Sequence, residues 1–183
     1  PTLTSNYEQT RINPNQPLTS DGTDNEFGLD ITWSPTPNNT ISGTYNPDFS
    51  QIEIDGAQLS VNTNFALYFP EKRPFFLDSA DFFESPSSLV YTRNIADPDY
   101  GLRGTGRQGN QTYGVVGAVD SQTNILRPGF DRSRIYTLPG ESTDFVGTYR
   151  YGFGKSSNVG TLITSRSADN YSSVLASIDG TWQ

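Results

Sequence analysis

Apolar and polar residues alternate along most of this chain, and the alternation limits it to strands. In the stretch EFGLDITW, every second residue is apolar: Phe27, Leu29, Ile31 and Trp33. Side chains of a β-strand point alternately to opposite faces, so such a run predicts a strand with one apolar and one polar face. The clearest further runs are 40–45, 112–120, 144–153, 158–166 and 173–182, with weaker ones at 2–12 and 100–107. The chain is therefore predicted to be all-β, with about eight antiparallel strands and little helix.

The predicted connections differ in length according to the end of the sheet at which they lie. Turn-forming residues make short connections at 34–39, 107–110 and 154–158. The alternate connections are long, at 13–25, 46–99 and 120–143, with 167–171 as a short exception. Short turns at one end and long loops at the other are typical of outer-membrane β-barrels.

The two predicted faces also suit a membrane barrel. One face is apolar with aromatic residues at or near the short-turn end, as expected at a membrane interface. These interface aromatics are Trp33, Tyr45, Tyr151, Phe153 and Trp182. The other face carries charges that are natural in a polar lumen and costly in lipid. These predicted lumen charges are Asp30, Arg103, Arg107, Arg150, Arg166 and Asp179.

A soluble or surface-exposed β-sandwich remains open as the alternative. It would bind carbohydrate or protein through aromatic loops, and it explains the alternation equally well. It explains the one-sided loop lengths and the terminal aromatics less well. We therefore expect a single β-barrel segment over residues 1–183.

Composition excludes several kinds of chemistry. The chain has no Cys and no His, which removes disulfides, thiolate catalysis, histidine triads and histidine zinc sites. Its formal net charge of -8 disfavours nucleic-acid binding, and we expect no cofactor. A carboxylate-dependent hydrolase is formally possible, although solvated acids are the simpler interpretation. The candidate carboxylates are Glu53, Asp55, Glu71, Asp78, Asp81 and Glu84, of which Asp78, Asp81 and Glu84 are also a weak calcium candidate.

Three strings carry a resemblance to a known family: YNPDFSQIEID, FALYFPEKRPFFLDSADFF and LVYTRNI. Together they resemble an outer-membrane β-barrel family of uncharacterised function, usually C-terminal to a family-9-like carbohydrate-binding module. The first string matches the family pattern at 46–51, Glu53 and Asp55, the second at 69–77, and the third at Tyr91 and Arg93. It departs where Asp78 and Ser79 replace Glu-Gly and where Asn94 replaces an arginine.

The resemblance implies a location and a set of partners. It implies the outer membrane of a Gram-negative bacterium, contact with outer-membrane lipid, and insertion by the barrel assembly machinery. The family barrel is longer than this chain, so we expect the N-terminal strands of a larger barrel. Its role would be passage or binding of a solute or glycan, without catalysis, and other outer-membrane or periplasmic proteins are further possible partners.

The longest predicted connection, 46–99, is a candidate plug or constriction of the lumen. Its phenylalanines, including Phe82 and Phe83, are expected to pack together. Its charges at 71–73 are expected to dock on the barrel wall, where Asp48, Glu53 and Asp55 would also meet arginines. The packing residues proposed for this loop are Phe69, Pro70, Glu71, Lys72, Arg73, Pro74, Phe75 and Phe76.

Overall fold

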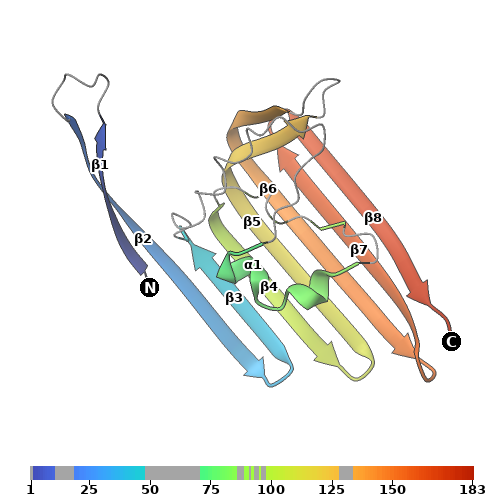
Figure 1. The fold of residues 1–183 in the computed structure, drawn as a ribbon. Coiled ribbons are helices and arrows are strands. Elements are labelled where there is room, and N and C mark those ends of the chain that lie inside the picture. Colours follow the sequence, from blue (N-terminus) through green and yellow to red (C-terminus); the bar gives the residue numbers. More distant parts are fainter. Residues whose placement is uncertain are drawn as a thin grey trace.

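The computed structural model describes residues 2–10, 19–47, 71–85, 89–90, 92, 95, 98–127 and 134–183. Strands dominate these residues, and two short helical turns interrupt the connection between the third and fourth strands (Figure 1). The elements are β1 (Thr2–Thr10), β2 (Thr19–Thr36), β3 (Asn39–Tyr45), α1 (Pro74–Leu77), the 3-10 helix η2 (Ala80–Phe83), β4 (Pro98–Gln108), β5 (Gln111–Arg127), β6 (Arg134–Phe153), β7 (Ser157–Ala168) and β8 (Tyr171–Thr181). The predicted all-β class is confirmed.

The strands follow one another in space in the order in which they occur in the chain. Each pairs antiparallel with the next, and β2 to β8 form one continuous ladder. Strand β1 pairs with the first part of β2, from Thr10 opposite Thr19 to Thr2 opposite Gly28. In the described part of the chain the sheet is open, with β1 and β8 at its two edges (Figure 1).

Two of the predicted long loops are wrong in extent. Strand β2 already begins at Thr19, so half of the predicted loop 13–25 is strand. Strands β5 and β6 continue to Arg127 and from Arg134, through most of the predicted loop 120–143. The register of this pair shifts between Asp120 and Gln122, which breaks the period-2 pattern while the ladder continues. The connection between β3 and β4 is long, as predicted.

Cross-strand register separates the side chains into two faces. One row runs Trp33, Ile41, Gly104, Val115, Gly147, Ile163 and Ala176, each directly opposite the next on β2 to β8. We call this side the apolar face. The neighbouring row contains Thr32, Ser42, Arg103, Val116, Val146 and Thr164, and its side is the polar face.

The apolar face is the uncovered one. Its large side chains are exposed to an unusual degree, and Ile178 and Trp182 keep 79% and 83% of their surface. The exposed members of this face are Phe27, Ile31, Trp33, Ile41, Tyr45, Tyr100, Leu102, Tyr113, Val115, Phe145, Tyr149, Tyr151, Val159, Ile163, Val174, Ile178 and Trp182. Charged residues are absent from the described positions of this face between the short turns and the row of Tyr45 and Tyr100.

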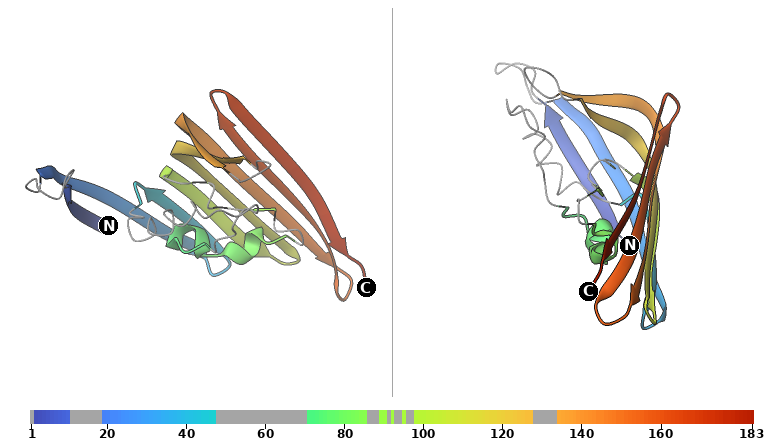
Figure 2. Two further views of the ribbon diagram at one scale, coloured as in Figure 1. Left: turned by 45° about the horizontal axis from the view of Figure 1, so that its top comes forward. Right: turned by 90° about the vertical axis from the view of Figure 1, so that its right-hand side faces the viewer.

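The buried core lies on the polar face. Residues from the β3–β4 connection pack there against the sheet, and Figure 2 shows α1 and η2 lying to one side of it. The core consists of Phe75, Phe76, Phe83 and Ile95 from the connection and Val116, Ala118 and Val146 from β5 and β6. None of the helices in the described ranges has the length and hydrophobicity needed to span a membrane.

Candidate functional site on the polar face

The β3–β4 connection places two short helical turns against the sheet. We call its described residues, 71–85 with 89, 90, 92 and 95, the inserted segment. Helix α1 begins at Pro74, where a missing N–H costs nothing, and the Asp78 N–H donates to the Pro74 carbonyl at 3.0 Å. Ser79 then takes a left-handed conformation with φ of 57°, and η2 follows. These turns direct Phe75, Phe76 and Phe83 into the core.

Two glycines of the sheet form sockets for this segment. A Cβ atom at Gly101 on β4 would lie 3.0 Å from the Phe75 ring, and one at Gly114 on β5 would lie 3.0 Å from the Phe83 ring. Real Cβ atoms rarely make contacts this short, so a side chain at either position would displace the ring. Glycine here permits close packing of an aromatic ring on the backbone.

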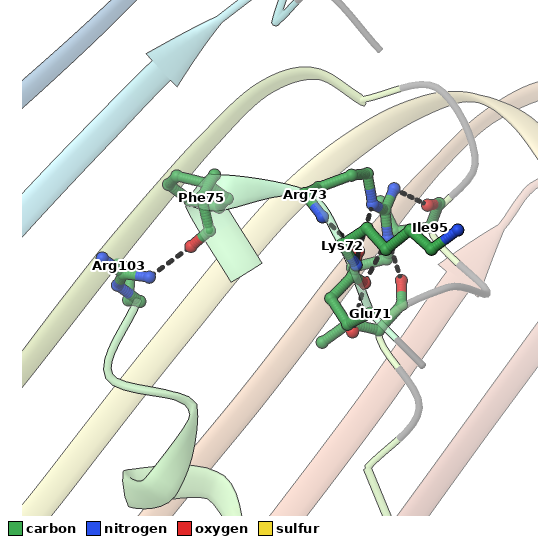
Figure 3. A network of polar contacts seen from close by, with 7 residues as sticks. Glu71, Lys72, Arg73, Phe75, Ile95 and Arg103 are labelled. Carbon is green, nitrogen blue, oxygen red and sulfur yellow. Dashed lines mark hydrogen bonds and ion pairs between the residues drawn. The ribbon is translucent and has the colours of Figure 1, made fainter. Parts of the chain in front are cut away.

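Arg103 on β4 joins the inserted segment to the sheet (Figure 3). Its guanidinium is buried, with 3% of the residue exposed, and donates to the carbonyl oxygens of Phe75 and Asp78. It also contacts the Asp78 carboxylate at 2.5 Å and the Ser42 hydroxyl at 3.2 Å. A cation is favourable where a helical turn ends in unpaired carbonyls, so Arg103 satisfies the end of α1 and holds it to the wall.

A second arginine, Arg73, connects the beginning and the end of the inserted segment. Arg73 donates to the carbonyls of Ile95 at 2.5 Å and Thr92 at 2.8 Å. Its Nε and Nη2 atoms reach the two carboxylate oxygens of Glu71, each at 2.8 Å (Figure 3). The prediction that residues 71–73 pair with charges of the wall is wrong for Glu71, whose carboxylate pairs with Arg73. They lie two residues apart, and their pairing closes almost no loop and costs little entropy.

The Glu71 carboxylate is held ionised by this arrangement. Burial alone would raise its pKa, but the hydrogen bonds and charge of Arg73, together with the Thr92 hydroxyl at 2.6 Å, lower the pKa to about 2. A group with so low a pKa does not serve as a general acid near neutral pH. Glu71 therefore acts as a structural anion that fixes Arg73.

The predicted lumen charges lie together on the polar face, and the structure identifies their partners. Arg107 pairs with Asp81 at 2.8 Å and lies over the Phe82 ring, while Arg150 pairs with Asp179 at 3.1 Å. Arg166 approaches Asp120 at 3.3 Å and Asp144 at 3.5 Å, and the Asp30 carboxylate accepts a hydrogen bond from Thr44. The suggested partners Asp48, Glu53 and Asp55 lie outside the described residues, as do Phe69 and Pro70.

The predicted interface aromatics divide between the two ends of the sheet. Phe153 contacts Tyr151 at 6.5 Å and Trp182 at 5.4 Å between ring centroids, beside the turn that follows β6. Trp33 lies opposite Ile41, close to the turn between β2 and β3. Placing Tyr45 near the short turns is wrong. Strand β3 leaves its turn at Asn39 and ends at Tyr45, which therefore lies at the opposite end, beside Tyr100.

The acidic residues proposed for calcium do not gather. The described residues contain no group of three or more acidic, His or Cys side chains that could hold a metal ion. Asp78 forms an ion pair with Arg103, and Asp81 forms one with Arg107. Of the hydrolase candidates, Glu53 and Asp55 lie outside the described residues.

A pocket of about 460 Å³ lies between the inserted segment and the wall. Its charged lining comes from both sides: Asp81 and Glu84 from the segment, and Arg107, Arg150 and Asp179 from the sheet. The hydroxyl group of Thr148, which also lines it, donates to the Phe82 carbonyl at 2.8 Å. We did not anticipate this pocket. The three-residue spacing of Asp81 and Glu84, which both line it, is the sequence signal that could have indicated it.

Comparison with known proteins gives a family and no function. No curated protein and no solved structure matches the chain significantly. Residues 4–114 match the family described as "Domain of unknown function (DUF5916)". The match covers more than half of the chain, including most of β1, all of β2 to β4, the inserted segment and the start of β5. The chain therefore belongs to the DUF5916 family.

Proposed function

We propose that the chain forms the N-terminal strands of a β-barrel in the outer membrane of a Gram-negative bacterium. The inserted segment narrows the lumen, and the protein passes or binds a solute, such as a glycan, without catalysing a reaction. The observation that carries this proposal is the reversed polarity of the sheet. Its apolar face is uncovered, and its charged face is covered by the inserted segment.

The apolar face is costly in water and favourable in lipid. Full burial of one large apolar side chain stabilises a protein by about 1.5–3 kcal/mol. In water, the exposed side chains of the apolar face would not contribute this stabilisation. A contiguous surface of this kind marks an interaction site or a membrane contact. Strands of 11 and 12 residues, as in β8 and β7, are also long enough to cross a bilayer when tilted.

The charges on the polar face are also consistent with a water-filled lumen. Arginine at the bilayer midplane costs about 2–4 kcal/mol when it faces lipid, and lumen positions avoid this cost. Arg103, Arg150 and Arg166 all lie on the polar face, opposite to the exposed aromatics. Open strand edges do not persist in hydrocarbon, so we further propose that additional strands of a longer chain close the barrel.

The soluble β-sandwich is less well supported. A sandwich buries the apolar faces of two sheets against each other. Within the described ranges there is one sheet, and the segment packed on it covers the polar face. A soluble protein with this arrangement would therefore leave its main apolar surface in water.

The two tryptophans of the chain provide the test, because both lie on the apolar face. In vesicles containing lipids brominated near the headgroup, we expect strong quenching of Trp33 and Trp182 fluorescence. The variants W33F and W182F assign the signal to each site. Folded protein that remains in solution without detergent, with unquenched tryptophans, would contradict the proposal.

A further inference from the structure

Three acidic residues recur at every third position of the inserted segment: Asp78, Asp81 and Glu84. Asp78 follows helix α1, Asp81 lies in the 3-10 helix η2, and Glu84 caps the C-terminal end of η2. Asp78 and Asp81 each meet an arginine of β4, Arg103 at 2.5 Å and Arg107 at 2.8 Å. The acidic row thus faces a basic row on the wall.

The third acid is not paired in this way. In the part of the chain that the structure describes, Glu84 forms no ion pair, although Arg150 lines the same pocket. Arg150 is instead directed along the wall, to Asp179 at 3.1 Å and Asn158 at 3.2 Å. This ion pair passes over Gly160, where a Cβ atom would lie 2.8 Å from an Asp179 oxygen. The absence of a side chain at Gly160 leaves room for this ion pair on the sheet.

The segment side of the pocket thus carries two carboxylates, and its sheet side carries two guanidiniums together with the Asp179 carboxylate. With three carboxylates and two guanidiniums in its lining, the pocket has one more negative than positive formal charge. A lone anion would be repelled, and a neutral solute would desolvate Glu84 without compensating its charge. Arg150 has five N–H donors in a planar group, and its pairing with Asp179 and Asn158 leaves some of them available.

We propose that this pocket binds a small zwitterionic solute, with its ammonium group against Glu84 and its carboxylate against Arg150. The solute would complete the third acid–arginine pair that the protein leaves open. The volume of about 460 Å³ is within the usual range for small-molecule sites. This deepens the proposed function and rests on it for the route, through the lumen, by which solute reaches the pocket.

Calorimetry on the purified full chain in detergent tests the charge requirement with four probes. These are β-alanine as zwitterion, propylamine as cation, propionate as anion and glucose as neutral solute. We expect β-alanine to bind at least about fivefold more tightly than each of the others, because only it engages both walls. Equal or tighter binding of glucose or of either single-charge probe would overturn the proposal, as would an absence of β-alanine binding.

A pair of charge-matched variants locates the binding. Glu84→Gln should weaken β-alanine binding about tenfold, the effect of losing about 1.4 kcal/mol of charge-assisted contact. Glu141→Gln removes the same charge from an exposed position on β6 outside the pocket and should leave the affinity unchanged. Equal effects of the two variants would overturn the assignment.

Tryptophan quenching by brominated lipid, measured on the same protein preparations after transfer into vesicles, separates the two proposals. Quenching without β-alanine binding refutes the pocket and leaves the membrane proposal in place. Binding that depends on Glu84, without quenching, supports the pocket and refutes its position in a membrane lumen.

Discussion

At the scale of single residues, the room left by a glycine and the charge of a carboxylate determine whether the inserted segment can pack on the sheet. Gly101 and Gly104 are two glycines of β4 on opposite faces. An added Cβ at Gly101 meets the Phe75 ring at 3.0 Å, whereas at Gly104 the nearest atom is a Val115 methyl at 3.5 Å, an ordinary contact. The same substitution thus has different predicted effects on the two faces.

Gly101→Ala should loosen the inserted segment because the Phe75 ring must move. Overpacking of this kind costs about 1–3 kcal/mol. Trypsin cleavage at Lys72 should become several-fold faster, and Gly104→Ala is the matched control with no change expected. Rapid cleavage at Lys72 in the unaltered folded protein would argue against a docked segment.

Glu71 gives the segment a defined pH dependence. Its pKa falls from the ordinary 4.5 to about 2 in the folded protein. A lowered folded pKa contributes stability that is fully present above the unfolded pKa and is lost as pH falls through the folded value. We therefore expect the segment to stay docked above pH 4.5 and to loosen as pH falls toward 2.

Cleavage by pepsin, which works in this pH range, measures the loosening. In Glu71→Gln the segment should already be loose at pH 5, because the buried Arg73 loses its ion pair with Glu71, a change that costs about 3 kcal/mol. A Glu71→Gln protein as resistant as the parent at pH 5 would contradict the role given to this carboxylate.

At the scale of elements, the inserted segment packs its phenylalanines on β5 and β6 and makes most of its polar contacts with β4. Strand β4 supplies Gly101 as a socket and Arg103 and Arg107 as cations. Arg103 is 3% exposed and bonds to two carbonyls and a carboxylate, whereas the Arg107–Asp81 pair is more than half exposed. Exposed ion pairs contribute about 0–1 kcal/mol, whereas removing Arg103 also leaves buried carbonyls without their donor, at about 1–3 kcal/mol each.

Replacing each arginine of β4 by glutamine should show this difference. We expect Arg103→Gln to release the segment and expose Phe75, Phe76 and Phe82 to chymotrypsin. Arg107→Gln should change the cleavage rate less than about fivefold, consistent with an exposed pair. A larger effect from Arg107 than from Arg103 would show that burial does not determine the docking strength.

The alternation of apolar and polar residues predicted which strands form better than it predicted where they begin and end or which residues contact each other. Alternation assigned Ile31, Ile163 and Asp30 to their faces because strand geometry is local. The alternation did not predict residues 19–25 of β2 as strand, because this stretch is polar and pairs with β1 through its backbone. It also failed to predict the continuation of β5 beyond Asp120, where the register of the β5–β6 pair shifts. The contacts of Arg73 with Thr92 and Ile95 span about twenty residues and leave no periodic trace in the sequence.

At the scale of the whole molecule, the central claim is that the apolar face contacts lipid and the polar face contacts a water-filled lumen. The absence of Cys allows this to be tested position by position, because each introduced cysteine is then the single labelling site. Strand β7 is well suited, since its residues 159–165 alternate between the faces and pair on both sides.

The most direct measurement is a nitroxide scan of residues 159–165 in vesicles, comparing collision with oxygen, which concentrates in lipid, and with a water-soluble nickel complex. The account predicts a period of two, with oxygen access highest at Val159, Thr161, Ile163 and Ser165 and nickel access highest at the residues between them. The opposite phase, or nickel access equal on both faces, would contradict it.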